Sequence, residues 1–191
     1  MKTTSLLTLC MLVAACADHP SPATAPDFEI PLVFDNVSGP KPDDNLTAHA
    51  SGDQEVPPRE TLARGNAIFH ISDDGLSVDY KLIVANIENV RQSHIHLGDP
   101  TVAGPIVVFL YGPVPAGGGR IDGVIAEGTL TAANLIGPLA GHPLSDLLSR
   151  MRDGTAYANV HTDDGVAPAN TGPGDFPGGE VRGQIMGGHT H

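Results

Sequence analysis

Two histidines, His94 and His96, are separated by one residue in a short segment, 93–97, that alternates as a β-strand does. In an extended strand, residues two apart point to the same face, so both imidazoles are expected side by side. A later segment, 155–162, carries His161 on one face of a second expected strand. If these faces meet, three neutral imidazoles form a ligand set suited to Cu(II) or Zn(II). The spacing thus makes these three histidines candidate metal ligands.

A second interpretation needs no metal, because buried histidines can also satisfy backbone groups and one another in a polar cluster. The HIH segment at 94–96 resembles the copper-ligand strand of Cu/Zn superoxide dismutase. The chain has neither that family's disulfide cysteines nor a zinc loop rich in His and Asp, so dismutase-like activity is only the enzymatic alternative. His189 and His191 lie in a terminal tail, where a histidine pair can bind metal weakly.

Other charged residues suggest structural roles. Arg182 alternates with apolar positions in the expected last strand, and its planar guanidinium is suited to pairing with Glu55 or Glu180 across strands. A ligand-binding role is the alternative for these three residues. Catalysis by a nucleophile has little support, because the sequence contains no Gly-x-Ser-x-Gly motif. The glycine run 117–119 does not follow a strand and open a helix, as a phosphate loop requires, and it is interpreted as a hairpin loop.

The first sixteen residues read as an export signal. Lys2 precedes an apolar stretch, 6–13, that is too short to span a hydrocarbon core of roughly 30 Å. The segment ends in VAAC, which resembles a lipobox, so Cys16 is expected to carry lipid and to anchor the protein to a membrane. The alternative is an ordinary secretory signal cut after small residues. Because Ala17 follows the cysteine, analogy with lipoprotein sorting predicts the outer membrane, within the cell envelope.

Composition narrows the partners. The formal charge is -12, and removing residues 1–15, which hold one lysine and no acid, changes it to -13. An acidic chain without a basic patch is not expected to bind nucleic acid. Of the two cysteines, Cys10 lies in the leader and Cys16 would carry lipid, so no disulfide is expected. The remaining partner is an unknown protein or small ligand.

The elements expected to position these residues are mainly strands. After a proline-rich tether, 16–44, whose apolar islands could alternatively dock as an edge strand, short alternating segments recur between Gly, Pro, Asn and Asp clusters. The expected strands are 46–51, 65–72, 76–86, 93–97, 106–111, 120–131, 155–162 and 180–186. Asp73, Asp74 and Gly75 predict a tight hairpin between the second and third.

One amphipathic helix interrupts this pattern. Leu144, Leu147, Leu148 and Met151 fall at i, i+3, i+4 and i+7, with Ser145 as the expected cap and Gly154 as the expected end. The connection 163–179 is rich in glycine and proline and is expected to be a long loop. The sequence therefore predicts an all-β domain, 45–187, followed by a His-containing tail, 188–191.

Seven motifs, in order, resemble the CHRD family, which is named after the module repeated in chordin. They are LTAHASGDQEVPP at 46–58, GNAIF at 65–69, LSVDYKL at 76–82, HIHLG at 94–98, GPIVV at 104–108, GTAYANVHT at 154–162 and GEVRGQI at 179–185. Two features depart from the family pattern: Ala158 and Asn159 replace the usual valine, and glycines and prolines are inserted before Glu180. Neither departure involves the histidines.

The resemblance implies an antiparallel β-sandwich or barrel-like domain that is exported and non-catalytic, and it implies no ligand. We therefore expect a lipid-anchored binding or structural module, and we assign no cofactor to it from the sequence. The alternative is a copper- or zinc-binding protein that uses the histidine cluster.

Overall fold

The strands form because alternating and β-branched segments bury one side chain in two against a common core. The computed structural model describes residues 45–187. Its strands are β1 (Asn45–Ser51), β2 (Arg64–Ile71), β3 (Val78–Glu88), β4 (Val90–Leu97), β5 (Ile106–Tyr111), β6 (Arg120–Leu130), β7 (Ala156–Thr162), β8 (Val181–Gln184) and β9 (Met186–Gly187). All the expected strands are present, and the expected last strand divides into β8 and β9.

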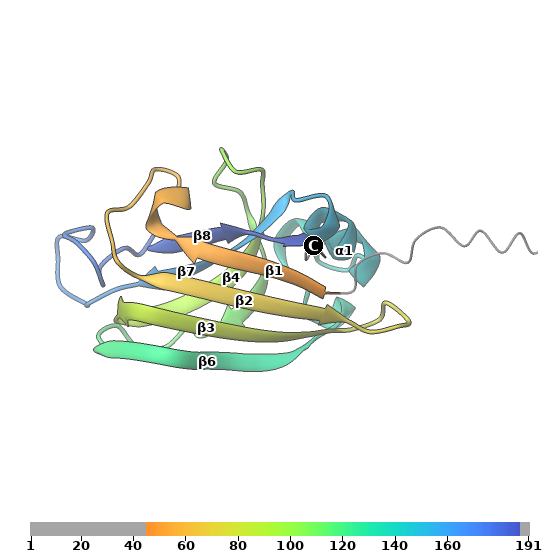
Figure 1. The fold of residues 1–191 in the computed structure, drawn as a ribbon, viewed down its shortest axis with the longest axis horizontal. Helices are drawn as coiled ribbons and strands as arrows, with labels where there is room; N and C mark the ends of the chain where they lie inside the picture. The colour runs from red at the N-terminus through yellow and green to blue at the C-terminus, as the bar shows by residue number, and fades with distance from the viewer. Residues whose placement is uncertain (1–44, 188–191) are drawn as a thin grey trace, which may run out of the picture. The chain divides into compact units, whose positions relative to one another are not determined.

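These strands make one antiparallel sheet in the order β5-β4-β7-β8-β1-β2-β3-β6, with β9 paired to β1 (Figure 1). The sheet curls into a nearly closed barrel. Its two end strands, β5 and β6, approach each other. Across the same gap, the hydroxyl of Tyr80 in β3, the neighbour of β6, donates to the carbonyl of Leu110 in β5 at 2.7 Å. The all-β, barrel-like prediction is confirmed.

Two turn predictions have opposite outcomes. The expected hairpin at Asp74 and Gly75 is present, and all of β2 pairs with residues 78–85 of β3. The hairpin expected at 117–119 is wrong, because β5 pairs with β4 whereas β6 pairs with β3. The glycine run instead connects the two strands at opposite ends of the sheet order. Whether a loop closes a hairpin depends on which strands pair, and these strands pair with segments other than each other. The composition of the loop alone therefore could not predict this connection.

The core fills the inside of the barrel. In β1, Leu46, Ala48 and Ala50 point inward, and the paired residues of β2 and β3 continue the same face. Ile95 of β4 and Val160 of β7 belong to this cluster as well. The side chains that alternate with them therefore point to the outer face of the barrel.

The helix α1 (Leu144–Arg152) lies at the end of the barrel where β1 begins (Figure 1). Its four predicted apolar residues are all buried, which confirms the predicted face. Ser145 does not cap it, because the N-cap position is Pro143 and Ser145 lies inside the first turn. Gly154 ends it in a left-handed conformation, with φ of 66°, as expected for a residue without a Cβ.

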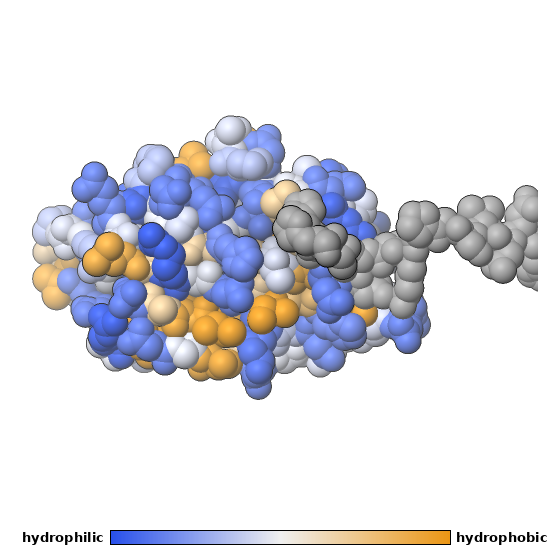
Figure 2. Space-filling model, in the orientation of Figure 1, coloured by the Kyte–Doolittle hydropathy of each residue, from blue (hydrophilic) through white to orange (hydrophobic). Residues whose placement is uncertain are grey.

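Hydrophilic side chains cover most of the face seen in Figure 2, and an apolar band lies along its lower strands. Ile68 of β2 and Val124 of β6 are among the exposed apolar residues of the described chain. Within residues 45–187, no helix combines the length and the apolarity that crossing a bilayer requires.

Candidate metal centre

The register of β4 against β7 brings the three predicted histidines together. His94 lies opposite Asn159, His96 lies opposite Tyr157, and His161 lies opposite Gln92. These side chains alternate with core residues, so they share the outer face of the sheet. His94, His96 and His161 are 0, 7 and 6 % exposed, because loops cover this face. The geometry required for a shared site, three imidazoles on one sheet face, is present.

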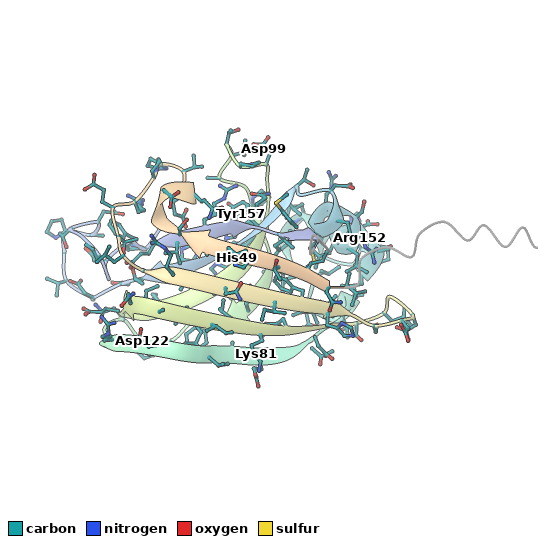
Figure 3. All side chains as sticks on the ribbon, viewed as in Figure 1. His49, Lys81, Asp99, Asp122, Arg152 and Tyr157 are labelled. Carbon is teal, nitrogen blue, oxygen red and sulfur yellow. The ribbon has the colours of Figure 1, made fainter. Side chains whose placement is uncertain are left out.

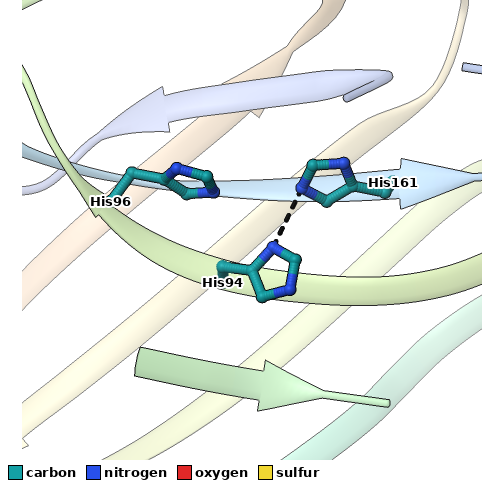
Figure 4. A group of neighbouring side chains, drawn as sticks. All are labelled: His94, His96 and His161. Atoms are coloured by element: carbon teal, nitrogen blue, oxygen red, sulfur yellow. Dashed lines mark hydrogen bonds between the residues drawn. The ribbon is translucent and has the colours of Figure 1, made fainter. Parts of the chain in front are cut away.

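The three rings converge on one point (Figure 4). One ring nitrogen from each histidine lies within 4.8 Å of the others. His94 Nδ1 lies 3.0 Å from His161 Nε2, and the ring centroids of His94 and His96 are 5.4 Å apart. Zinc–nitrogen bonds are about 2.0–2.1 Å long, so nitrogens bound to one ion lie roughly 3–4 Å apart. The observed spacing is therefore close to what three nitrogens around one ion require.

Two of the rings are oriented by backbone carbonyls. His96 Nδ1 lies 2.8 Å from the carbonyl of Gly104, and His161 Nδ1 lies 2.8 Å from the carbonyl of Pro177. A carbonyl only accepts, so each Nδ1 carries the hydrogen and each Nε2 carries the lone pair. Second contacts of this kind fix the tautomer and the orientation of metal-binding histidines. The lone pair of His96 Nε2 is thereby free, whereas that of His161 Nε2 faces His94 Nδ1.

The third ring, that of His94, is held by a hydrogen bond to His161. Because His161 Nε2 has the lone pair, His94 Nδ1 must donate to it. His94 Nε2 is then an acceptor, and it is buried without a hydrogen-bond partner among the described residues. His96 Nε2 is buried and unpartnered in the same sense. Buried polar atoms are rarely left unsatisfied, so the cluster has unused ligand capacity.

All three imidazoles are held neutral. Burial, together with the smaller effects of the neighbouring His161 and His96, lowers the pKa of His94 to about 3. Burial also lowers the pKa of His161 to about 4 and that of His96 in the same direction. Metal ions bind the neutral ring, so protons compete weakly with a metal here at neutral pH.

Asn159 supplies an oxygen at the same place. Its Oδ1 lies 3.0 Å from His161 Nε2, and its amide also contacts His96. Its amide nitrogen faces Glu55, whose pKa it lowers as a hydrogen-bond donor. Asn159 Oδ1 therefore faces His161 Nε2, so two hydrogen-bond acceptors lie opposite each other. A cation bound between these two atoms would satisfy both of them. The sequence placed Asn159 on this face, but its role as an oxygen donor depends on the β4 register.

An aromatic stack supports His96. Its ring lies parallel to Tyr157, at 4.9 Å between centroids and 11° between planes. The guanidinium of Arg182 lies 3.5 Å from the centre of the Tyr157 ring and donates to the carbonyls of Asp99 and Val102. Figure 3 shows Tyr157 beside the loop that carries Asp99. Stacking and hydrogen bonding thus fix that loop over the histidines.

The predicted ion pairs take a different form. Arg182 is buried, and it lies close enough to Glu55 to lower the pKa of the Glu55 carboxyl. Within residues 45–187, however, no direct salt bridge joins the two side chains. Glu180 instead accepts hydrogen bonds from Thr61, Thr162 and the Gly174 amide. These hydroxyl partners come from β7 and the β1–β2 loop. Arg182 and Glu180 therefore tie separate loops to the sheet.

Glu55 lies beside Asn159 and Arg182, on the same face of the sheet as the histidines. Burial raises its pKa to about 7, against the attraction of Arg182 and Arg59. Gly179 has φ of 124°, and a Cβ there would meet the Glu55 carboxylate, so glycine is needed for this approach. Glu55 and Arg182 also line a cleft with Pro58, Pro100 and Gln184.

Several predicted features lie outside the described residues: the leader, Cys16, the tether 16–44 and the tail with His189 and His191. The geometry of residues 45–187 bears only on the histidine cluster and its surrounding polar layer.

Comparison with known proteins gives one family. The model of the CHRD domain matches residues 46–185, which is most of the chain and nearly all of the described barrel. No curated protein matches the sequence. The family suggests a non-catalytic binding or structural module. The motifs, the antiparallel barrel and this match agree, and the chain belongs to the CHRD family.

Proposed function

We propose that this protein is an exported, lipid-anchored binding module that holds one copper or zinc ion through His94, His96 and His161. The observation that carries the proposal is the convergence of three neutral imidazoles, two of which have their Nδ1 hydrogens bound to carbonyls. The buried Nε2 of His96 has no hydrogen-bond partner among the described residues, which leaves its lone pair to the ion. The donor set of imidazole nitrogens and one amide oxygen suits these metals and not calcium or magnesium.

Burial favours binding over turnover. The three histidines are almost fully covered by loops, and His94 has no exposed surface. A catalytic metal keeps an open position for substrate, whereas a structural or carrier site is closed by protein ligands. Asn159 Oδ1 lies 3.0 Å from His161 Nε2, and as the fourth donor it would complete a set of four protein ligands. This closure supports a non-catalytic role and argues against superoxide dismutation.

The test is metal analysis of the full chain, expressed without a His tag, followed by titration with copper or zinc at pH 7.5 and near pH 5. We expect one ion per chain at pH 7.5 and nearly the same binding near pH 5, because burial lowers the pKa of His94 to about 3 and that of His161 to about 4, so these rings stay neutral at both pH values. A His94→Ala/His96→Ala/His161→Ala variant should lose this ion. A His189→Ala/His191→Ala variant, which changes only the tail, is the matched control and should retain it.

Equal uptake by the triple variant and the wild type would place binding elsewhere in the chain. A folded wild type that takes up no metal, together with a triple variant of clearly lower melting temperature, would identify the histidines as a structural polar cluster. Dismutase activity should be absent from the metal-loaded protein. A measurable rate that depends on the three histidines would overturn the non-catalytic assignment.

A further inference from the structure

A second cluster of ligand-type side chains lies apart from the histidines, in the loop between β7 and β8. Asp163, Asp164 and Asp175 each place one carboxylate oxygen within 4.8 Å of the others. Asp163 and Asp164 are half-buried, and Asp175 is 2 % exposed. Like charges this close repel one another strongly when water is excluded. The loop therefore concentrates negative charge where the solvent screens it poorly.

Asp175 provides an observation independent of this clustering. Its Oδ2 accepts hydrogen bonds from the backbone amide and the hydroxyl of Thr171, both at 2.9 Å. Its Oδ1 is buried and has no hydrogen-bond partner within residues 45–187. Buried carboxylates are normally paired or bound to metal, so an unused oxygen at this position calls for a cation.

The basic side chain next to the cluster does not satisfy it. Arg91 Nε lies 3.8 Å from Asp163 Oδ2, and its NH1 donates to the Val114 carbonyl. Arg91 is partly exposed, and within residues 45–187 its hydrogen bonds and ion pairs reach neither Asp164 nor Asp175. The buried carboxylate therefore has no direct compensating charge among the described side chains.

We propose that Asp163, Asp164 and Asp175 bind one calcium ion. Hard cations prefer oxygen ligands, and Ca²⁺ accepts irregular sets of carboxylates, carbonyls and water, whereas Mg²⁺ demands near-ideal octahedral geometry. A loop of glycines and prolines offers such an irregular set. The ion would tie Asp163 and Asp164, which follow β7, to Asp175. Asp175 lies between Gly174, whose amide donates to Glu180, and Pro177, whose carbonyl accepts from His161.

This site is chemically separate from the histidine cluster. It contains no nitrogen donor, and the histidine cluster contains no carboxylate ligand. Calcium should therefore bind whether or not the histidines hold a transition metal. The two proposals fail independently.

The test is calorimetric titration of CaCl₂ into the full chain after removal of metals with EDTA and exchange of the buffer. We expect one ion per chain, with a Kd of roughly 10⁻⁴–10⁻³ M, the range of extracellular modules. The thermal melt should rise with added calcium, because ligand that binds only the folded state stabilises it. An Asp175→Asn variant should bind at least tenfold more weakly, because the amide lacks the negative charge.

An Asp163→Asn/Asp164→Asn variant removes two half-buried charges and should also bind at least tenfold more weakly. It decides the question if Asp175→Asn fails to fold. A Glu60→Gln/Asp153→Asn variant removes two exposed charges elsewhere and should bind calcium as the wild type does, as should the triple histidine variant. A folded wild type without saturable calcium binding, or unchanged binding by Asp163→Asn/Asp164→Asn, would overturn the proposal.

Discussion

His94 Nδ1 lies 3.0 Å from His161 Nε2, although the two residues are 67 positions apart in the chain. Without metal, this contact is a hydrogen bond in which His94 donates. An ion that takes both nitrogens must displace that hydrogen, so the proton of His94 must move from Nδ1 to the Nε2 of the same ring. Metal uptake is therefore coupled to a change of tautomer at His94, without net proton release from the neutral ring.

The metal-free protein should lose stability as pH falls below about 6.5. Burial lowers the pKa of His94 to about 3 and of His161 to about 4, whereas both rings titrate near 6.5 when unfolded. Below 6.5 the unfolded chain binds more protons than the folded one, so protonation favours unfolding. Between pH 7.5 and 5 we expect a loss on the order of 2–4 kcal/mol, measured by chemical denaturation after chelation.

A His94→Asn/His161→Asn variant should show a smaller pH dependence, because the two titrating groups are gone. A His70→Asn variant is the control, since His70 is exposed on β2. The same acid sensitivity in the wild type and in the variant without His94 and His161 would contradict the assignment.

Glu55→Gln should stabilise the protein at pH 8 and have less effect at pH 5. The pKa of Glu55 is raised to about 7 by burial, so the folded state holds this proton more tightly than the unfolded state does. Stability is then lost as pH rises from about 4.5 through 7, and a neutral amide removes that loss. We expect a gain of about 1–3 kcal/mol at pH 8, from urea unfolding at both pH values.

Asp53→Asn is the comparison for Glu55→Gln, because Asp53 lies two residues away and is exposed. A gain of the same size at both pH values would show that the carboxyl of Glu55 does not titrate with folding.

Arg182→Lys should lower the free energy of unfolding by about 2 kcal/mol or more, even though the charge is kept. Lysine cannot cover the Tyr157 ring with a planar group while donating to the carbonyls of both Asp99 and Val102. The loop over His96 should loosen, and metal affinity should fall with stability. Arg150→Lys, at an exposed position of α1, should change neither quantity. Equal stability of both variants would refute a positioning role for Arg182.

Cys16→Ser should release the protein from the membrane fraction, because Cys16 is the residue expected to carry the acyl chains. Radioactive fatty acid should label the wild type and leave the variant unlabelled. Cys10→Ser, which alters the other cysteine of the leader, should retain both label and membrane association. A wild type without label would favour the ordinary secretory signal.

Period-two alternation was enough to predict the strands and the shared direction of His94 and His96, because these are local properties of extended chain. The meeting of His161 with them depends on β4 pairing with β7, which joins segments far apart in sequence. Local sequence patterns do not give the register between β4 and β7. The resemblance to the CHRD family supplied only the motif that contains His161, and not its strand partner. The hairpin expected at 117–119 was wrong for the same reason, because β5 and β6 pair with other strands.

The features of the site that the sequence did not predict depend on contacts made by loops. The carbonyls of Gly104 and Pro177 orient two histidines, yet every residue has a carbonyl and composition cannot single these out. The amide of Asn159 could be placed on the correct face, whereas its oxygen is oriented by Glu55 from another loop. Charge complementarity suggested a pair between Arg182 and Glu55 or Glu180, but Arg182 donates to backbone carbonyls instead.

Strand β7 is buried along both faces, with Val160 in the apolar interior and His161 in the polar outer layer. A slip of one residue in its pairing would exchange the faces and bury His161 among aliphatic side chains without its hydrogen bonds. Evenly apolar buried strands lack such a penalty and tolerate misalignment. The histidines thus raise the energy of misfolded pairings during folding, an effect that operates before any metal binds.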